Sequence, residues 1–252
     1  MAAALSVNVN AIALLRNRRN LPWPSLEVLA RIALEAGAHG ITVHPRPDER
    51  HIRRADVPVL ASLVRQFPGA EFNIEGNPDA RFIELVESVK PDQVTLVPDD
   101  VRQATSDHGF DVAAHRSFLT DIIARLRSGG MRVSVFVEAE PERAGEARDV
   151  GADRIEIYTG PYGGAPDPET GSRELDKIAR TGAAARDAGI GLNAGHDLTL
   201  VNLPPLVAKL PNLAEVSIGH ALTADALIHG MAETVRLYRK ALNLAPTGAG
   251  MV

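Results

Sequence analysis

One pattern repeats along this chain: a short apolar run, a polar cluster and then an amphipathic stretch. We expect the short runs, most of them rich in valine and isoleucine, to be strands: Leu5–Val9, Gly40–Val43, Glu71–Ile74, Gln93–Val97, Arg132–Val137, Arg154–Tyr158, Ile190–Leu192 and Glu215–Ile218. Runs of this kind are typical of strands that are buried on both faces. The intervening stretches predict helices at 25–37, 54–66, 79–89, 111–128, 141–150, 171–188, 200–209 and 223–242.

Strands and helices that alternate in this way, over 252 residues, match a (β/α)8 TIM barrel in number and size. An open, doubly wound sheet is the alternative, but that fold usually has fewer strands and a glycine-rich first turn. No shift in composition marks a linker, so we expect a single domain at residues 1–244. The segment 245–252 has the composition of a loose C-terminal tail.

Composition excludes several classes of protein. The chain has no cysteine, which excludes a disulfide framework and any zinc site built on thiolates. Its net charge of −5 argues against a nucleic-acid partner. No apolar stretch is long enough to span a membrane, and the N-terminal segment lacks the features of a signal peptide. We therefore expect a cytoplasmic protein.

Polar residues gather where the expected strands end, which is where TIM barrels carry their chemistry. Three of the eight histidines belong to this group, and histidine has the ordinary pKa closest to neutrality. They indicate proton transfer, although each alone could simply satisfy local backbone groups. The residues are Asn8, Asn10, His44, Arg46, Glu75, Asp99, Asp100, Glu138, Glu156, Thr159, Asn193, His196 and His220.

Several segments are suited to binding an anion. The segment 44–51 contains two arginines and two histidines, which form either an anion clamp or a solvated charged loop. The cluster 16–19 is either a phosphate contact or a solvated turn. Gly195 and Gly219 follow the last two strands, where many barrels bind phosphate through backbone N–H groups, but both also suit ordinary tight turns.

Some catalytic devices are missing from the sequence. The four lysines, at 90, 177, 209 and 240, all fall in expected helices or at their ends, so none is placed to form an imine with a substrate. There is no P-loop and no dinucleotide-binding glycine motif. A transition-metal site would need scattered ligands such as His44, Glu75, His196 and His220, and their spacing provides no positive signal.

Taken together, the motifs resemble one family closely, that of pyridoxine 5'-phosphate synthase in the deoxyxylulose-dependent route to vitamin B6. The resemblance extends over residues 5 to 242. The matching segments are 7–10, 15–17, 35–44, 48–51, 73–75, 96–98, 155–160, 193–196 and 218–221.

The resemblance implies a TIM barrel with additional helices, assembled as a homo-octamer built from dimers. It implies a transferase that joins 1-deoxy-D-xylulose 5-phosphate to 3-amino-2-oxopropyl phosphate and releases pyridoxine 5'-phosphate, phosphate and water. It also implies that the reaction uses no metal and no organic cofactor.

The same resemblance assigns roles to individual residues. His44 is implied as proton acceptor, Glu75 as a second acid/base and His196 as proton donor. Substrate binding is implied for Asn8, Arg19, Asp197, Gly219 and His220 around the aminoketone phosphate, and for Arg46, His51 and Thr105 around the deoxyxylulose phosphate. Ser106 is an alternative to Thr105.

The chain departs from the family pattern in its first strand. Asn10 and Ala11 stand where the family has Asp and His, so Asn10 can still hydrogen-bond a substrate hydroxyl, but Ala11 cannot. Asp197 stands where a glycine is frequent, and we expect it to meet a phosphate only through its backbone N–H. Two other functions therefore remain open: a metal-dependent lyase or hydrolase barrel, and a non-catalytic barrel that binds phosphosugars.

Overall fold

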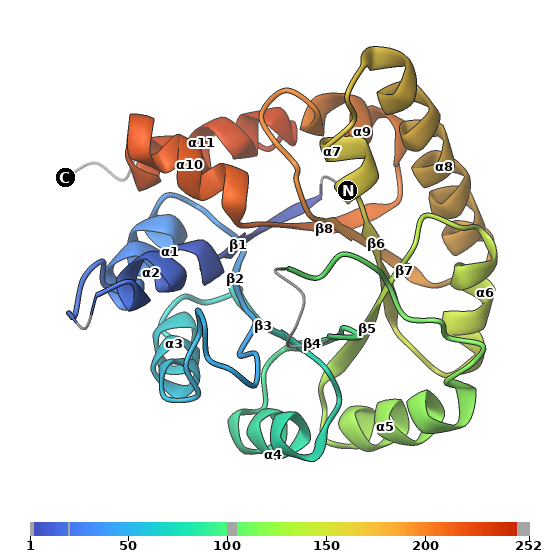
Figure 1. The fold of residues 1–252 in the computed structure, drawn as a ribbon, viewed down its shortest axis with the longest axis horizontal. Helices are drawn as coiled ribbons and strands as arrows, with labels where there is room; N and C mark the ends of the chain where they lie inside the picture. Colours follow the sequence, from blue (N-terminus) through green and yellow to red (C-terminus); the bar gives the residue numbers. More distant parts are fainter. Residues whose placement is uncertain (1–2, 20, 100–104, 246–252) are drawn as a thin grey trace.

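The chain folds into a closed barrel of eight parallel strands surrounded by helices (Figure 1), which confirms the TIM barrel. The computed structural model describes residues 3–19, 21–99 and 105–245. Each strand pairs with the next along the chain, and β1 closes the ring by pairing with β8. The strands are β1 (Ala4–Asn8), β2 (Gly40–Val43), β3 (Glu71–Gly76), β4 (Gln93–Leu96), β5 (Arg132–Val137), β6 (Arg154–Tyr158), β7 (Gly191–Gly195) and β8 (Leu213–Ile218).

The helices form the outer layer. They are α1 (Asn10–Asn17), α2 (Leu26–Glu35), α3 (Asp56–Val64), α4 (Ala80–Val89), α5 (Arg116–Ser128), α6 (Glu142–Asp149), α7 (Gly160–Gly163), α8 (Pro168–Asp187), α9 (Leu203–Lys209), α10 (His220–His229) and α11 (Met231–Ala241). The sequence did not predict α1 or α7. It predicted one helix at 223–242, but Gly230 has φ 77° and ψ 151°, which no helix contains, so the segment splits into α10 and α11.

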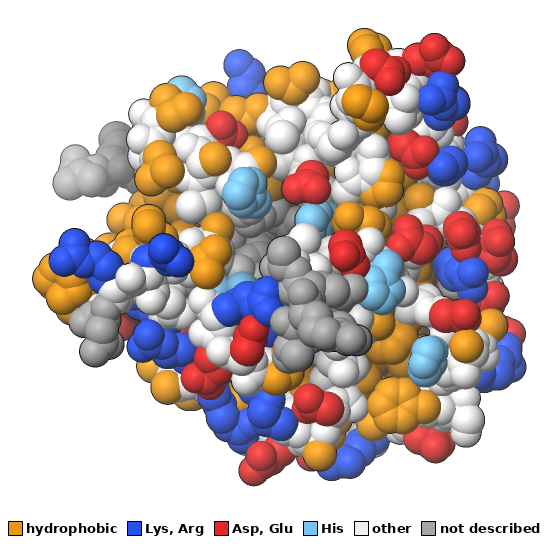
Figure 2. Space-filling view, in the orientation of Figure 1, with side chains coloured by type: hydrophobic (Ala, Val, Ile, Leu, Met, Phe, Trp, Pro, Cys, Tyr) orange, Lys and Arg blue, Asp and Glu red, His pale blue; other side chains and the backbone are white. Residues whose placement is uncertain are grey.

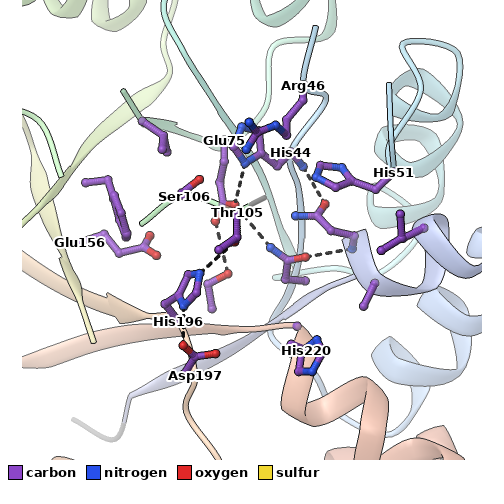
Figure 3. Close-up of a pocket in the computed structure, with 18 residues that line it drawn as sticks. His44, Arg46, His51, Glu75, Thr105, Ser106, Glu156, His196, Asp197 and His220 are labelled. Atoms are coloured by element: carbon purple, nitrogen blue, oxygen red, sulfur yellow. Dashed lines mark hydrogen bonds and ion pairs between the residues drawn. The ribbon is translucent and has the colours of Figure 1, made fainter. Parts of the chain in front are cut away.

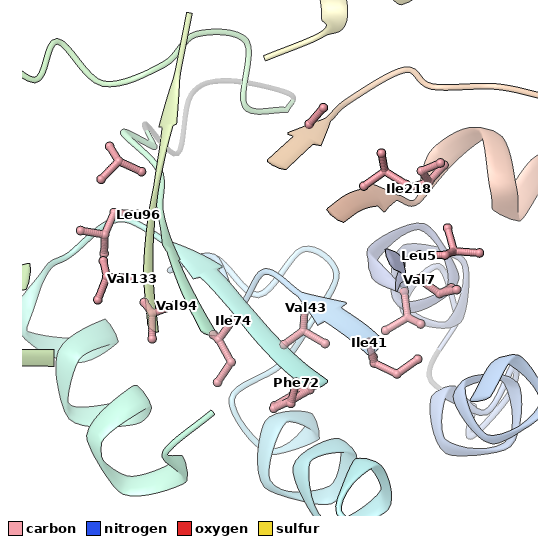
Figure 4. Packing of buried hydrophobic residues seen from close by; sticks show 14 of the residues in the cluster. Leu5, Val7, Ile41, Val43, Phe72, Ile74, Val94, Leu96, Val133 and Ile218 are labelled. Carbon is pink, nitrogen blue, oxygen red and sulfur yellow. The ribbon is translucent and has the colours of Figure 1, made fainter. Parts of the chain in front are cut away.

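Most of the strands alternate between apolar and polar side chains; Phe136 in β5 is an apolar exception that faces the cavity. Val7, Ile41, Ile74 and Val94 are among the apolar residues that point outward and pack against the helices (Figure 4). Their neighbours in sequence are polar and point into the barrel. The expectation that the strands are buried on both faces is therefore confirmed, and the hydrophobic residues lie mainly on the outer face.

Hydrogen bonds link the inward polar residues across the barrel. In its middle, Ser6 Oγ lies 2.6 Å from Thr42 Oγ1, and Asn73 bridges Thr42 and Thr95 at 3.3 and 3.0 Å. Nearer the amino ends of the strands, Arg154 Nη1 lies 3.4 Å from Glu215 Oε2. This network supports the open end of the barrel, because buried polar groups are stable only when they are paired.

The structure also bears on the expected C-terminal tail and on membrane-spanning segments. The predicted tail at 245–252 lies outside the described residues except for Ala245. In the described part of the chain, no helix is both long enough and apolar enough to cross a membrane.

Arg16, in the basic cluster after the first strand, has a structural role. It is 9% exposed, and its guanidinium donates two hydrogen bonds to the Asp56 carboxylate, at 2.7 and 2.9 Å. This pair joins the end of α1 to the start of α3. Neither alternative predicted for Arg16, a phosphate contact or a solvated turn, describes this arrangement. Arg18 and Arg19 are exposed.

We predict that Arg16→Ala lowers the free energy of unfolding by about 2–3 kcal/mol, because it leaves the Asp56 carboxylate without its partner. The measurement is urea unfolding followed by circular dichroism. Arg18→Ala, two positions further on and exposed, is the matched control and should leave the unfolding midpoint unchanged. Equal midpoints for the two variants would show that the ion pair contributes nothing.

Candidate active site

A cavity of about 410 Å3 opens at the carboxyl ends of the strands. Histidine side chains surround the hollow in Figure 2, and Figure 3 shows how the lining residues lie. The cavity brings together every predicted site residue except Arg19: Asn8, Asn10, His44, Arg46, His51, Glu75, Thr105, His196, Asp197, Gly219 and His220. Ser106, the alternative to Thr105, lines it as well.

Glu75, on β3, is the buried carboxyl group at the floor of the cavity. Asn8 Nδ2 donates to its Oε2 and Ser217 Oγ donates to its Oε1, both at 3.4 Å, and His44 Nδ1 lies 3.9 Å from Oε2. Burial raises the pKa of Glu75 to about 7, although the nearby His44 opposes the shift. At neutral pH this group can therefore either give or accept a proton.

His44 follows β2 and is held by Asn10, the first residue of α1. Its backbone N–H donates to Asn10 Oδ1 at 2.9 Å, and Asn10 N–H in turn donates to Asn8 Oδ1 at 2.9 Å. The carbonyl oxygen of the Asn10 side chain is thus engaged by the protein itself. The amide of Asn10 and the small side chain of Ala11 line the cavity beside it.

Asp99 follows β4 and joins His44 to Arg46. Its carboxylate is paired with His44 Nε2, lies 3.3 Å from Arg46 Nη1 and accepts a 3.0 Å hydrogen bond from Ser106 Oγ. Burial alone would raise the pKa of Asp99, but His44 and Arg46 outweigh it and lower the pKa. Asp99 is therefore an ionised carboxylate beside the site.

His51 is a neutral hydrogen-bonding group. Burial, together with the charges of His44 and Arg46, lowers its pKa to about 3. Its Nδ1 accepts a 2.9 Å hydrogen bond from the Ile52 backbone N–H, so the ring proton resides on Nε2. In the predicted anion clamp, the positive charge thus comes from the arginine, while His51 supplies an N–H donor.

His196 follows β7 in a conformation with φ 87°, and Asp197 comes next with φ 56°. His196 Nδ1 lies 2.9 Å from Asp197 Oδ2, its Nε2 lies 3.0 Å from Thr105 Oγ1, and its ring stands edge-on to Tyr158 at 5.1 Å. The hydrogen bond from His196 lowers the pKa of Asp197. The Asp197 carboxylate is therefore directed at the histidine.

Gly219 allows the backbone to approach Asn8 closely. A Cβ at this position would lie 3.0–3.1 Å from three atoms of the Asn8 side chain, which is tighter than ordinary packing. Gly219 caps α10, whose first-turn N–H groups are available to an anion, and His220 begins the helix at the cavity edge. This is the geometry of a phosphate site at a helix N-terminus.

Ser217 and Phe136 line the cavity but were not predicted, and neither Glu156 nor Asp99, the partner of His44, was assigned a role. Glu156 is 3% exposed, and its Oε2 has no hydrogen-bond partner among the described residues. Burial, reinforced by the charges of Glu75 and Glu215, raises the pKa of Glu156 well above its ordinary value. Glu156 and Asp99 stood among the strand-end polar residues. The alternation along β6 could have shown that Glu156 points inward.

Metal binding finds no support in the arrangement of ligands. Within residues 3–19, 21–99 and 105–245, no three histidine or carboxylate side chains are grouped so as to hold an ion.

Known proteins resemble this chain over nearly its whole length. A family model described as "Pyridoxal phosphate biosynthesis protein PdxJ" matches residues 5–244. A pyridoxine 5'-phosphate synthase from Allorhizobium ampelinum is 59% identical over 245 residues, covering 96% of this chain and 98% of the relative. Another, from Mesorhizobium japonicum, is 58% identical over 243 residues, covering 96% and 99%.

Solved structures share the fold at low identity. A thiamine phosphate pyrophosphorylase from Pyrococcus furiosus has a TM-score of 0.61 at 16% identity and covers 95% of each chain. The YdjI aldolase from Escherichia coli K12 has a TM-score of 0.64 at 13% identity, covering 99% of this chain and 94% of the aldolase. At such identities the likeness concerns the barrel alone.

The raised pKa of Glu75 predicts a pH dependence of stability. Between its ordinary pKa of 4.5 and its folded value of about 7, the folded state binds more protons than the unfolded state, so this group's contribution to stability falls as pH rises. Glu75→Gln removes that contribution. We expect the drop in urea midpoint from about pH 5 to about pH 8 to be smaller in the variant. An unchanged drop would contradict the raised pKa.

Proposed function

Because this chain belongs to the PdxJ family of pyridoxal phosphate biosynthesis proteins, we propose that it is a pyridoxine 5'-phosphate synthase. It joins 1-deoxy-D-xylulose 5-phosphate to 3-amino-2-oxopropyl phosphate and releases pyridoxine 5'-phosphate, phosphate and water. The observation that supports this most directly is the gathering of His44, Glu75 and His196 around one cavity. The near full-length identity to synthases from other bacteria supports it independently. The cytoplasmic location and the lack of a nucleic-acid partner stay predictions from composition.

The reaction requires proton transfers at several steps. The amine of one substrate forms an imine with the ketone of the other, so the enzyme needs no lysine at the site, and all four lysines lie on helices or at a helix end. His44 accepts protons, His196 donates them, and Glu75 does either, because its pKa lies near neutrality. The reaction needs no metal or organic cofactor in this proposal.

Two parts of the cavity suit the two phosphate groups. Gly219 and His220 lie at the start of α10, and together with Asn8 and the backbone N–H of Asp197 they bind the aminoketone phosphate. On the side of β2, Arg46 supplies positive charge and His51 an N–H donor to the deoxyxylulose phosphate, with Thr105 beside them. Asn10 donates its amide to a hydroxyl of that substrate.

Loss of an acid/base group should reduce turnover strongly. We predict that Glu75→Gln and His44→Asn each lower kcat by at least about a hundredfold, the usual scale for general acid/base catalysis. The exposed His229, at the end of α10, provides the control His229→Asn, which should keep wild-type turnover. Near-normal turnover in both cavity variants would remove these residues from the proton-transfer steps.

The activity itself is tested with both substrates in excess chelator. We predict that pyridoxine 5'-phosphate and phosphate form in equal amounts. Activity that requires added metal would favour the lyase or hydrolase alternative. Binding of either substrate without any product would favour the non-catalytic phosphosugar-binding barrel.

Arg19 connects the function to the proposed homo-octamer built from dimers. Its side chain is exposed and does not line the cavity of its own subunit. Leu14, Leu15 and Trp23, around the same segment, are 46%, 52% and 63% exposed, an apolar surface suited to a second copy. Arg19 therefore binds the aminoketone phosphate in the neighbouring subunit of a dimer.

This arrangement predicts complementation between two inactive variants. Arg19→Ala and Glu75→Gln should each have little activity alone. Random co-assembly of the two should restore about a quarter of wild-type activity, because one site in four combines an intact Glu75 with an intact neighbouring Arg19. The measurement is the activity of co-expressed, differently tagged subunits. No recovery would show that Arg19 acts within its own subunit.

A further inference from the structure

Asp99 contacts one particular ring nitrogen of His44. Its side chain is 2% exposed, and it contacts residues from two segments: His44 and Arg46 after β2, and Ser106 further along its own loop. Of the two ring nitrogens of His44, it is Nε2 that faces this carboxylate. The other nitrogen, Nδ1, faces Glu75 Oε2 at 3.9 Å.

The pairing decides where the proton of neutral His44 resides. An ionised carboxylate can only accept hydrogen bonds, so the histidine nitrogen beside it must carry a proton. Neutral imidazole has one N–H and one lone pair, so a proton fixed on Nε2 leaves the lone pair on Nδ1. That lone pair is on the side of Glu75 and the cavity.

We infer that Asp99 is a positioning residue for the proposed synthase reaction: it holds the proton of His44 on Nε2, and so makes Nδ1 the atom that accepts a proton. In that step the proton passes from the substrate to Nδ1, and the electron pair of the broken bond stays on the substrate. The resulting imidazolium is stabilised by Asp99 on one side and can pass its new proton to Glu75 on the other.

The charged groups around the pair favour this assignment. Arg46 faces Asp99 from the loop after β2, and Ser106 donates to it from the loop after β4. On the other elements, Glu75 faces His44 from β3, and His51 lies 5.8 Å from it, ring centre to ring centre. Because Arg46 and His44 lower the pKa of Asp99, while burial raises that of Glu75, the two carboxyl groups on either side of His44 have different pKa values.

A purely structural role for Asp99 would predict something different. If Asp99 only linked Arg46 and Ser106 to the barrel, its loss would lower stability or substrate affinity and leave the protonated nitrogen of His44 unchanged. The two roles are therefore separated by the tautomer of His44 and by a comparison of kcat with KM.

The test is 15N NMR of the imidazole nitrogens of His44 in the full-length protein, with Asp99→Asn as the variant. In the wild type we expect neutral His44 to carry its proton on Nε2. In Asp99→Asn the side-chain amide can donate to Nε2, so we expect the proton to move to Nδ1 and kcat to fall at least about tenfold with a smaller change in KM. Asp99→Glu, which retains the carboxylate, should restore the Nε2 tautomer and part of the activity.

A matched control lies at the other end of the same strand. Asp92, just before β4, accepts a 2.8 Å hydrogen bond from the Phe72 backbone N–H, far from the cavity lining. Asp92→Asn should change stability without changing the His44 tautomer. A wild-type His44 protonated on Nδ1, or an Asp99→Asn variant with wild-type kcat and the Nε2 tautomer, would overturn the inference.

The tautomer measurement does not depend on the proposed activity. If the wild type forms no pyridoxine 5'-phosphate, the proposed function fails, while the NMR of His44 still decides whether Asp99 fixes its proton. If Asp99→Asn does not fold, Asp99→Ser, which also removes the carboxylate, takes its place, and a wild-type His44 protonated on Nδ1 would overturn the inference by itself.

Discussion

The structure depends on one constraint, the alternation of side chains along strands that close into a ring. Outward positions supply apolar residues to the layer beneath the helices, and most inward positions supply polar ones. Inward polar groups pair with each other in the Ser6, Thr42, Asn73 and Thr95 hydrogen bonds. This hydrogen-bonded interior allows Glu75 to be placed, nearly buried, at the floor of an open cavity.

The barrel gives three similar carboxyl groups different pKa values. Asp99 lies against Arg46 and His44 and is ionised. Glu156, deeper and close to other carboxyl groups, has its pKa raised well above the ordinary value. Glu75 is intermediate, with a pKa of about 7. A cavity that holds a base, an acid and a group able to be either is suited to a reaction with several proton transfers.

Much of this could be predicted from the sequence, because strand ends in a parallel barrel meet at one face. All eight strands were predicted within a few residues, and every predicted site residue but one lines the cavity. The features that the sequence did not predict depend on long-range contacts and backbone angles, which local patterns do not encode. The pairing of Arg16 with Asp56 joins residues forty positions apart, and the φ of Gly230 splits a helix whose apolar pattern continues through it. Arg19 is exposed in the single chain, and in our proposal the site that it serves lies in another subunit.

Burial over a polar barrel interior adjusts the pKa of Glu75 for proton transfer near neutral pH. Infrared difference spectroscopy can follow its carboxyl band directly, with Glu75→Gln identifying the band. We predict that the band titrates with a midpoint close to 7 in the folded enzyme. A midpoint near 4.5, the ordinary value for a glutamate, would contradict it.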